Sequence, residues 1–142
     1  MADSFAKFRG VGKIKEIEKA MNDGLGNFLF DTQSKLSEAA PVETGRLASS
    51  FVLGKDQPNR EKEPVRDTPG AVTVTRKYSK NEITIDSDWY ISNNLEYAYT
   101  VANDPIYGKG GRVGGAAWYT SIANNLQRDA DASFDRQFRK IK

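Results

Sequence analysis

The sequence predicts an α+β fold in which a long N-terminal helix and a C-terminal helix pack on a small antiparallel sheet of three to four strands. Apolar residues recur at helical spacing near both ends of the chain, whereas its middle alternates apolar and polar residues as strands do. A length of 142 residues suits a single domain, residues 1–142. We expect residues 1–12 to be a flexible arm, and residues 56–70 and 102–115 to be long, mobile loops.

The first helix is predicted over residues 13–40. Its apolar positions recur every three or four residues and charged residues lie between them, which is typical of an amphipathic helix. The segment "NDGLGN" is the weakest point, because Gly24 and Gly26 each cost about 1 kcal/mol relative to alanine inside a helix. Pro41 ends the helix, since the residue before a proline avoids the α region.

The middle of the chain predicts strands. Residues 49–53 form the first, and the segments "AVTVTRK" and "NEITIDSD" predict a hairpin that turns near residues 79–81. The apolar side chains of this hairpin share one face: Val72, Val74, Ile83 and Ile85. The aromatic segment "WYISNNLEYAYTV" fits a strand and a helical turn equally well, with a break at its two asparagines.

The second helix is predicted over residues 116–140. Its apolar side chains repeat every four residues: Trp118, Ile122, Leu126, Ala130, Phe134 and Phe138. We expect this row to be buried against the sheet or the first helix. Basic residues in the last turns complement the helix dipole.

Composition excludes several classes of protein. The 21 basic and 19 acidic residues give a net charge of +2, which does not demand a nucleic-acid partner. The chain has no cysteine and therefore no disulfide framework and no thiolate metal site. It begins without the apolar core of a signal peptide, and no run approaches the roughly 20 apolar residues of a membrane span.

Catalytic motifs do not emerge either. Without histidine the usual serine triad is missing and zinc loses its commonest ligand. The segment "GKGGRVGG" is not a phosphate-binding loop, because Gly110 follows Lys109 where serine or threonine is required. It is not a dinucleotide loop either, because Val113 replaces the third glycine. We therefore expect a flexible loop, no cofactor and no enzymatic activity.

Two alternatives stay open. Asp86 and Asp88 end a predicted strand and would serve a metal-dependent nuclease if a further acid and a lysine lay nearby, although aspartates in such places are commonly turn formers. Candidates for these groups are Glu96, Asp104 and Lys109. The other alternative is a DNA-contacting module that stacks bases on aromatic side chains. Six aromatic residues are concentrated in one third of the chain: Tyr90, Tyr97, Tyr99, Tyr107, Trp118 and Tyr119. The only basic residues among them are Lys109 and Arg112, so we favour a role for the aromatic residues in the core or at a subunit interface.

The corner between the first helix and the sheet carries a resemblance. "APVETGRLASS" resembles the Ala-Pro-Val-Asp-Thr-Gly-x-Leu-x-x-Ser signature of the tail-completion, or neck, proteins of long-tailed bacteriophages. "YISNNLEYAYTV" is similar to the Asn-Asn-x-x-Tyr-Ala segment of that family, although "VAND" stands where the family has a Val-Glu-x-Gly run. The order of elements also matches the family over residues 13–138.

The resemblance implies a non-enzymatic structural protein of the virion, assembled in the host cytoplasm, with no membrane partner. Such proteins form a ring, typically six-fold, that completes the tail and joins it to the DNA-filled head. Their partners are further copies of the chain and the connector, neck, tail-tube or terminator proteins next to the ring. DNA passes through the channel without sequence-specific binding.

The corner, the aromatic segment and the glycine-rich loop supply the candidate interaction residues. At the corner Gly45 admits a left-handed backbone and Arg46 offers a two-pronged donor to a carboxylate. We expect the candidates to lie at ring or neck contacts and not in the core: Thr44, Gly45, Arg46, Tyr97, Lys109 and Arg112.

Overall fold

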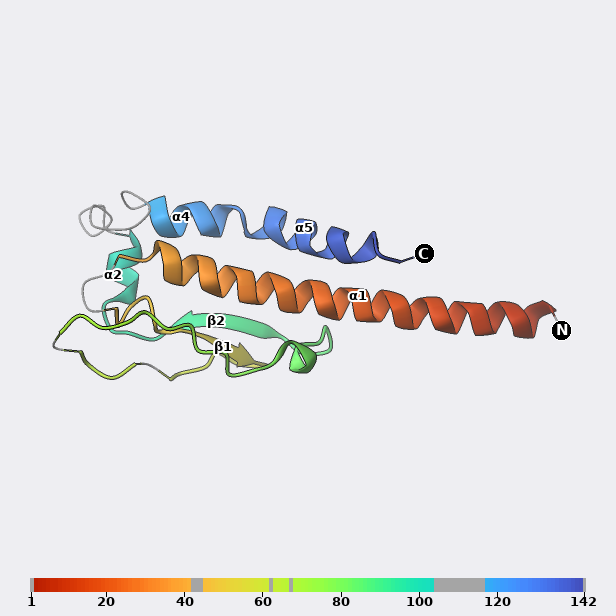
Figure 1. Ribbon diagram of the computed structural model, residues 1–142, viewed down its shortest axis with the longest axis horizontal. Coiled ribbons are helices and arrows are strands. Elements are labelled where there is room, and N and C mark those ends of the chain that lie inside the picture. The colour runs from red at the N-terminus through yellow and green to blue at the C-terminus, as the bar shows by residue number, and fades with distance from the viewer. Residues whose placement is uncertain (1, 42–44, 62, 67, 104–116, 142) are drawn as a thin grey trace.

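The computed structural model describes residues 2–41, 45–61, 63–66, 68–103 and 117–141. Its elements are α1 (Ala2–Ala39), β1 (Phe51–Lys55), the short 3₁₀ helix η1 (Lys80–Glu82), β2 (Trp89–Asn93), α2 (Ala98–Asn103), α4 (Ala117–Asn124) and α5 (Leu126–Phe138). Figure 1 shows an elongated molecule in which α1 runs along the whole length, α4 and α5 follow one side of it, and the strands lie on the other. The α+β class is confirmed.

Helix α1 is longer than its sequence pattern predicts. It begins at Ala2, so the backbone is helical where we expected a flexible arm, and it ends at Ala39. Its N-terminal part projects beyond all other elements (Figure 1). Along residues 12–19 every side chain is exposed, Ile14 to 63% and Ile17 to 43%, and the first buried one is Ala20. From residue 12 onward, burial of α1 by the rest of the chain thus begins at Ala20.

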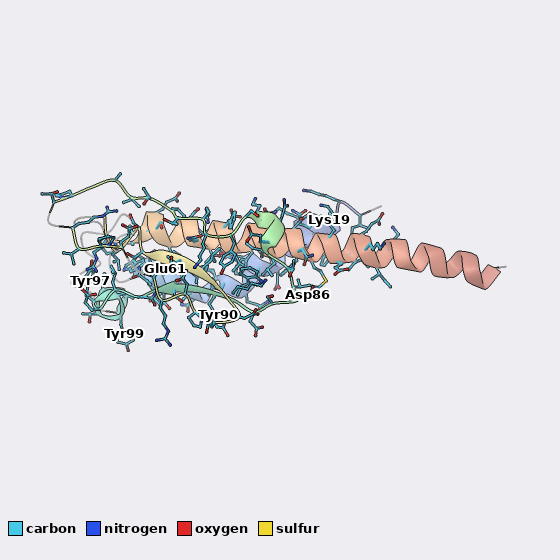
Figure 2. The ribbon with its side chains drawn as sticks, turned by 90° about the horizontal axis from the view of Figure 1, so that it is seen from below. Lys19, Glu61, Asp86, Tyr90, Tyr97 and Tyr99 are labelled. Atoms are coloured by element: carbon cyan, nitrogen blue, oxygen red, sulfur yellow. The ribbon has the colours of Figure 1, made fainter. Side chains whose placement is uncertain are left out.

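The predicted sheet of three to four strands is wrong, because the described residues form two strands. β1 and β2 pair antiparallel, with Leu53 opposite Ile91 and Phe51 opposite Asn93. The aromatic segment resolves into strand β2 followed by helix α2, with the break at the two asparagines. Figure 2 shows the length of this layer, with Asp86 near one end and Tyr97 near the other.

The predicted hairpin does not form. Val72 and Val74 are half-buried between exposed threonines, so their alternation is real, but residues 71–76 are no strand. Side chains bond to part of their backbone instead: the Thr73 N–H donates to Ser49 Oγ (3.0 Å), and the Thr75 carbonyl accepts from Gln33 Nε2 (2.9 Å). The segment "NEITIDSD", predicted to be the second strand of the hairpin, instead begins within the 3₁₀ helix η1.

The predicted C-terminal helix is interrupted at Asn125. Trp118 at its start is 2% exposed, whereas Leu126 and Phe138 are 38% and 39% exposed. The expected burial of the whole apolar row is therefore wrong. In an α-helix, each step of four residues moves the side chain about 40° further round the axis. The later residues of the row therefore leave the face of the helix on which Trp118 lies.

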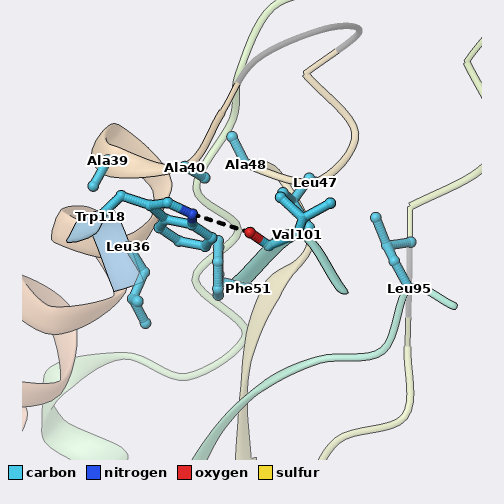
Figure 3. Close-up of a cluster of buried hydrophobic side chains, with 9 residues drawn as sticks. All are labelled: Leu36, Ala39, Ala40, Leu47, Ala48, Phe51, Leu95, Val101 and Trp118. Atoms are coloured by element: carbon cyan, nitrogen blue, oxygen red, sulfur yellow. Dashed lines mark hydrogen bonds between the residues drawn. The ribbon is translucent and has the colours of Figure 1, made fainter. Parts of the chain in front are cut away.

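The main core lies where α1, β1, α2 and α4 meet. Trp118 contacts Phe51 edge-to-face at 6.3 Å between ring centroids, and its Nε1 donates to the Val101 carbonyl (3.4 Å). Figure 3 shows the buried side chains around this indole: Leu36, Ala39, Ala40, Leu47, Ala48, Phe51, Leu95 and Val101. A smaller cluster joins α1 to the sheet through Leu29, Leu53 and Ile83.

Candidate functional site

Gly45 opens the described part of the corner. Its φ of +86° is a conformation that side-chain-bearing residues rarely adopt. A Cβ there would also lie 2.8 Å from the Gly70 carbonyl oxygen and 2.9 Å from Arg66 Nη1. The position therefore requires glycine for its backbone angle and for the close approach of the polar loop.

Arg46 is buried, with only 7% of its surface exposed. Its Nε donates to the Glu63 carbonyl (2.9 Å), and its Nη1 donates to Glu96 Oε1 (3.2 Å). The guanidinium carbon lies 6.0 Å from the centre of the Tyr97 ring. Arg46 thereby joins the polar loop to the segment between β2 and α2. The expectation that it lies outside the core is wrong.

The rest of the corner is held by buried side chains. Leu47 and Ala48 belong to the main core. The Ser50 hydroxyl donates to the Arg46 carbonyl (2.6 Å), and the Ser37 hydroxyl donates to the Ala48 carbonyl (2.6 Å). The corner is consequently a packed joint between α1 and the sheet.

The polar loop, residues 56–70, which we expected to be mobile, is held by polar side chains. Asn94 Nδ2 donates to the carbonyls of Asn59 and Glu61 (2.6 and 2.8 Å), and Asn59 Nδ2 donates to the Leu53 carbonyl (3.1 Å). These bonds hold the described part of the loop against the outer face and edge of the sheet.

The loop also carries a surface ion pair. Lys77 Nζ lies 2.9 Å from Glu61 Oε1, and both side chains are well exposed. The hydrogen bond and charge of Lys77 lower the pKa of Glu61, and the same contact raises the pKa of Lys77. In contrast, burial lowers the pKa of Arg76, which stacks 4.3 Å above the Phe30 ring.

The candidate interaction residues that the structure describes do not form an exposed patch. Tyr97 is half-buried and packs against the main core beside Arg46. Thr44, Lys109 and Arg112 lie outside the described residues. Of the six candidates, the structure thus brings three together, Gly45, Arg46 and Tyr97, in one packed joint.

Asp86 and Asp88 are both exposed. The backbone of Asp88 closes the end of the sheet: its carbonyl accepts from the Asp56 N–H (2.7 Å), and its N–H donates to Asp56 Oδ1 (3.2 Å). Within the described ranges, no group of three or more acidic residues could hold a metal ion. The structure therefore adds no support to the nuclease alternative.

An apolar groove is the feature that the sequence pattern did not predict. Two adjoining hollows, of about 360 and 240 Å³, share Leu36, Ile91 and Tyr119. Together they form what we call the β2 groove, bounded by β2 on one side and α4 on the other, with α1 as its floor. Its lining has no charged residue: Phe28, Leu29, Thr32, Leu36, Leu47, Phe51, Ile91, Asn93, Ala98, Tyr99, Ala102, Trp118, Tyr119, Ile122, Ala123 and Leu126.

No protein-family model, curated protein or solved structure matches the chain. Among the described helices, none is both long enough and apolar enough to cross a membrane.

Proposed function

We propose that this chain is a structural protein of the neck of a long-tailed bacteriophage. It completes the tail and joins it to the DNA-filled head as one subunit of a ring around the DNA channel. The observation that carries the proposal is the signature "APVETGRLASS" at the corner between a long helix and a sheet.

The corner supports this resemblance because its described signature positions have definite roles in the fold. Gly45 needs its positive φ, Leu47 packs in the core, and the Ser50 hydroxyl bonds the backbone of the turn. A motif with such specific demands is a mark of shared architecture. In this proposal the described signature residues serve the fold, and the ring contacts lie elsewhere on the surface.

The projecting part of α1 supports assembly. Most helical stability in proteins comes from the packing of an apolar side of the helix and not from helix propensity. Ile14 and Ile17 are large apolar residues on a part of α1 that no other described element covers. A neighbouring subunit in a ring would cover them.

The proposal is tested by a nonsense mutation in the gene for this chain, in the phage that carries it. We expect electron microscopy of the lysate to show filled heads and separate tails. Addition of the purified chain to this lysate should restore joined, infectious particles, whereas chain with Gly45→Val, which cannot adopt the corner, should not. Normal particles from the mutant phage would refute the proposal. Salt-sensitive DNA affinity without any effect on joining would favour the DNA-contacting alternative.

A further inference from the structure

The two outer edges of the sheet differ in how their backbone groups are satisfied. Bonded and non-bonded pairs alternate along an antiparallel ladder. Since the Asp56 N–H donates to the Asp88 carbonyl, the register makes Tyr90 and Ser92 the residues of β2 that bond to β1. Ile91 between them therefore directs its N–H and C=O away from β1. Its partner Leu53 in β1 likewise directs its N–H and C=O away from β2, at the other edge of the sheet.

The edge of β1 is capped by side-chain amides. Gln33 Nε2 donates to the Phe51 carbonyl (2.7 Å), and Asn59 Nδ2 donates to the Leu53 carbonyl (3.1 Å). The edge of β2 has no such cap, because no hydrogen bond reaches the outward N–H or C=O of Ile91 in the part of the chain that the structure describes. An open edge of this kind is a template for another strand.

The open edge borders the β2 groove. Ile91 lines both of its hollows, while Tyr119 and Ile122 of α4 form the opposite wall. A strand that pairs with β2 would place every second side chain in this uncharged groove, above Leu36 of α1. Backbone bonds and apolar pockets are together the requirements of recognition by strand addition.

We propose that the β2 groove binds an extended, uncharged segment of a partner protein as a third strand of the sheet, with apolar residues at alternate positions. The occupant is a different protein because the extended segments described in this chain are already engaged. β1 bonds to β2, and residues 72–75 bond to Ser49 and Gln33. This inference stands on the edge and the groove, and it does not depend on the proposed function.

The test uses the full chain and a fluorescent peptide of seven residues that alternates threonine and valine, with both ends blocked. We expect saturable binding that slows hydrogen exchange at the Ile91 amide by about tenfold or more, because the amide enters a new ladder. The amides of Tyr90 and Ser92, which already bond to β1, should change little. The same peptide with N-methyl groups on alternate amides should not bind.

Two tyrosines of equal exposure give a matched pair of variants. Tyr119, 40% exposed, lines the groove, and Tyr90, 39% exposed, lies on β2 outside its lining. Tyr119→Asp should weaken peptide binding by about tenfold or more, since it puts a charge in an apolar site. Tyr90→Asp should change it less than about twofold, and both variants should keep the circular dichroism of the parent chain.

Three results would overturn the proposal. Equal binding of the N-methylated peptide would mean that the backbone edge is not used. Slow exchange of the Ile91 amide in the free monomer would mean that the chain covers the edge itself. Protection that appears only at high protein concentration, together with a dimer in sedimentation, would make a second copy the occupant.

Discussion

The hydroxyl of Ser133 on α5 donates a hydrogen bond of 2.7 Å to the carbonyl oxygen of Gly24 on α1, and both residues are buried. Helix backbones come this close only where one side offers no side chain. A Cβ on Gly24 would lie 2.7 Å from Phe134 Cδ1 and 3.1 Å from Phe134 Cα. At Gly24, α5 therefore packs directly against the backbone of α1.

We predict opposite effects for the two glycines of "NDGLGN". Gly24→Ala should destabilise the chain by about 1–3 kcal/mol, because the methyl group forces α5 away. Gly26→Ala should stabilise it by up to about 1 kcal/mol, since the nearest atom is the Lys80 side chain at 3.7 Å and alanine is the better helix former. Urea denaturation of both variants measures this, and equal effects would contradict the packing described.

Gly24 and Gly26 also show which features of the fold the sequence pattern can predict and which it cannot. Helical spacing predicts α1 through this segment, but Gly24 and Gly26 look alike in that pattern. What separates them is the position of α5, more than a hundred residues later in the chain, and local periodicity contains no information about it. The sequence therefore predicts a helix through this segment, but it does not reveal that Gly24 is needed for the close packing of α5.

Arg46→Ala should destabilise the chain, contrary to what the sequence pattern suggests. The change leaves the Glu63 carbonyl without its buried donor, which costs about 1–3 kcal/mol. Glu96→Gln is the control, because the Glu96 side chain is 60% exposed and such ion pairs contribute at most about 1 kcal/mol. The measurement is the midpoint of urea denaturation. An unchanged midpoint for Arg46→Ala would show that the arginine does not hold the joint.

The row of apolar residues in the C-terminal helices gives a third prediction. Trp118→Ala should cost about 3–5 kcal/mol, since the indole is 2% exposed and packs on Phe51. Leu126→Ala should cost less than about 1 kcal/mol, because this side chain is partly in solvent. Thermal unfolding by circular dichroism separates the two. A larger loss for Leu126→Ala than for Trp118→Ala would contradict the burial of Trp118 and the exposure of Leu126 described above.

The missing strands show a second limit of the pattern. Alternation of Val72 and Thr73 correctly predicts which side chains turn inward. The alternation does not predict which groups form hydrogen bonds with the backbone of this segment. In the structure, Gln33 Nε2 donates to the carbonyls of both Phe51 and Thr75. One amide side chain thus stands where a ladder of strand bonds was expected. The β2 groove escaped prediction for a similar reason, because elements far apart in the sequence line it: α1, β1, β2, α2, α4 and α5.

The Glu61–Lys77 pair predicts a specific pH dependence. A lowered pKa of Glu61 in the folded chain contributes stability above the ordinary pKa of a glutamate, and this is lost as pH falls through the lowered value. The raised pKa of Lys77 contributes below the ordinary lysine pKa and is lost as pH rises through the raised value. In an NMR titration, Lys77→Gln should return the Glu61 pKa towards its ordinary range. High salt should reduce the shift in the parent chain, because both groups are exposed. A Glu61 titration identical in parent and variant would exclude the pair in solution.

The last prediction concerns the projecting part of α1. The double change Ile14→Gln and Ile17→Gln should weaken self-association of the chain by about tenfold or more, since each buried isoleucine contributes about 1.5–3 kcal/mol to an interface. Glutamine keeps helix propensity high. Both isoleucines are exposed within the single chain, so the unfolding midpoint of the monomer should stay near that of the parent. Lys15→Gln with Glu18→Gln is the control, because it changes two exposed charged residues of the same turns and leaves both isoleucines in place. Sedimentation velocity over a range of concentrations makes the comparison. If the isoleucine variant assembles as the parent does, neighbouring subunits do not cover this part of α1, and the ring must use another surface.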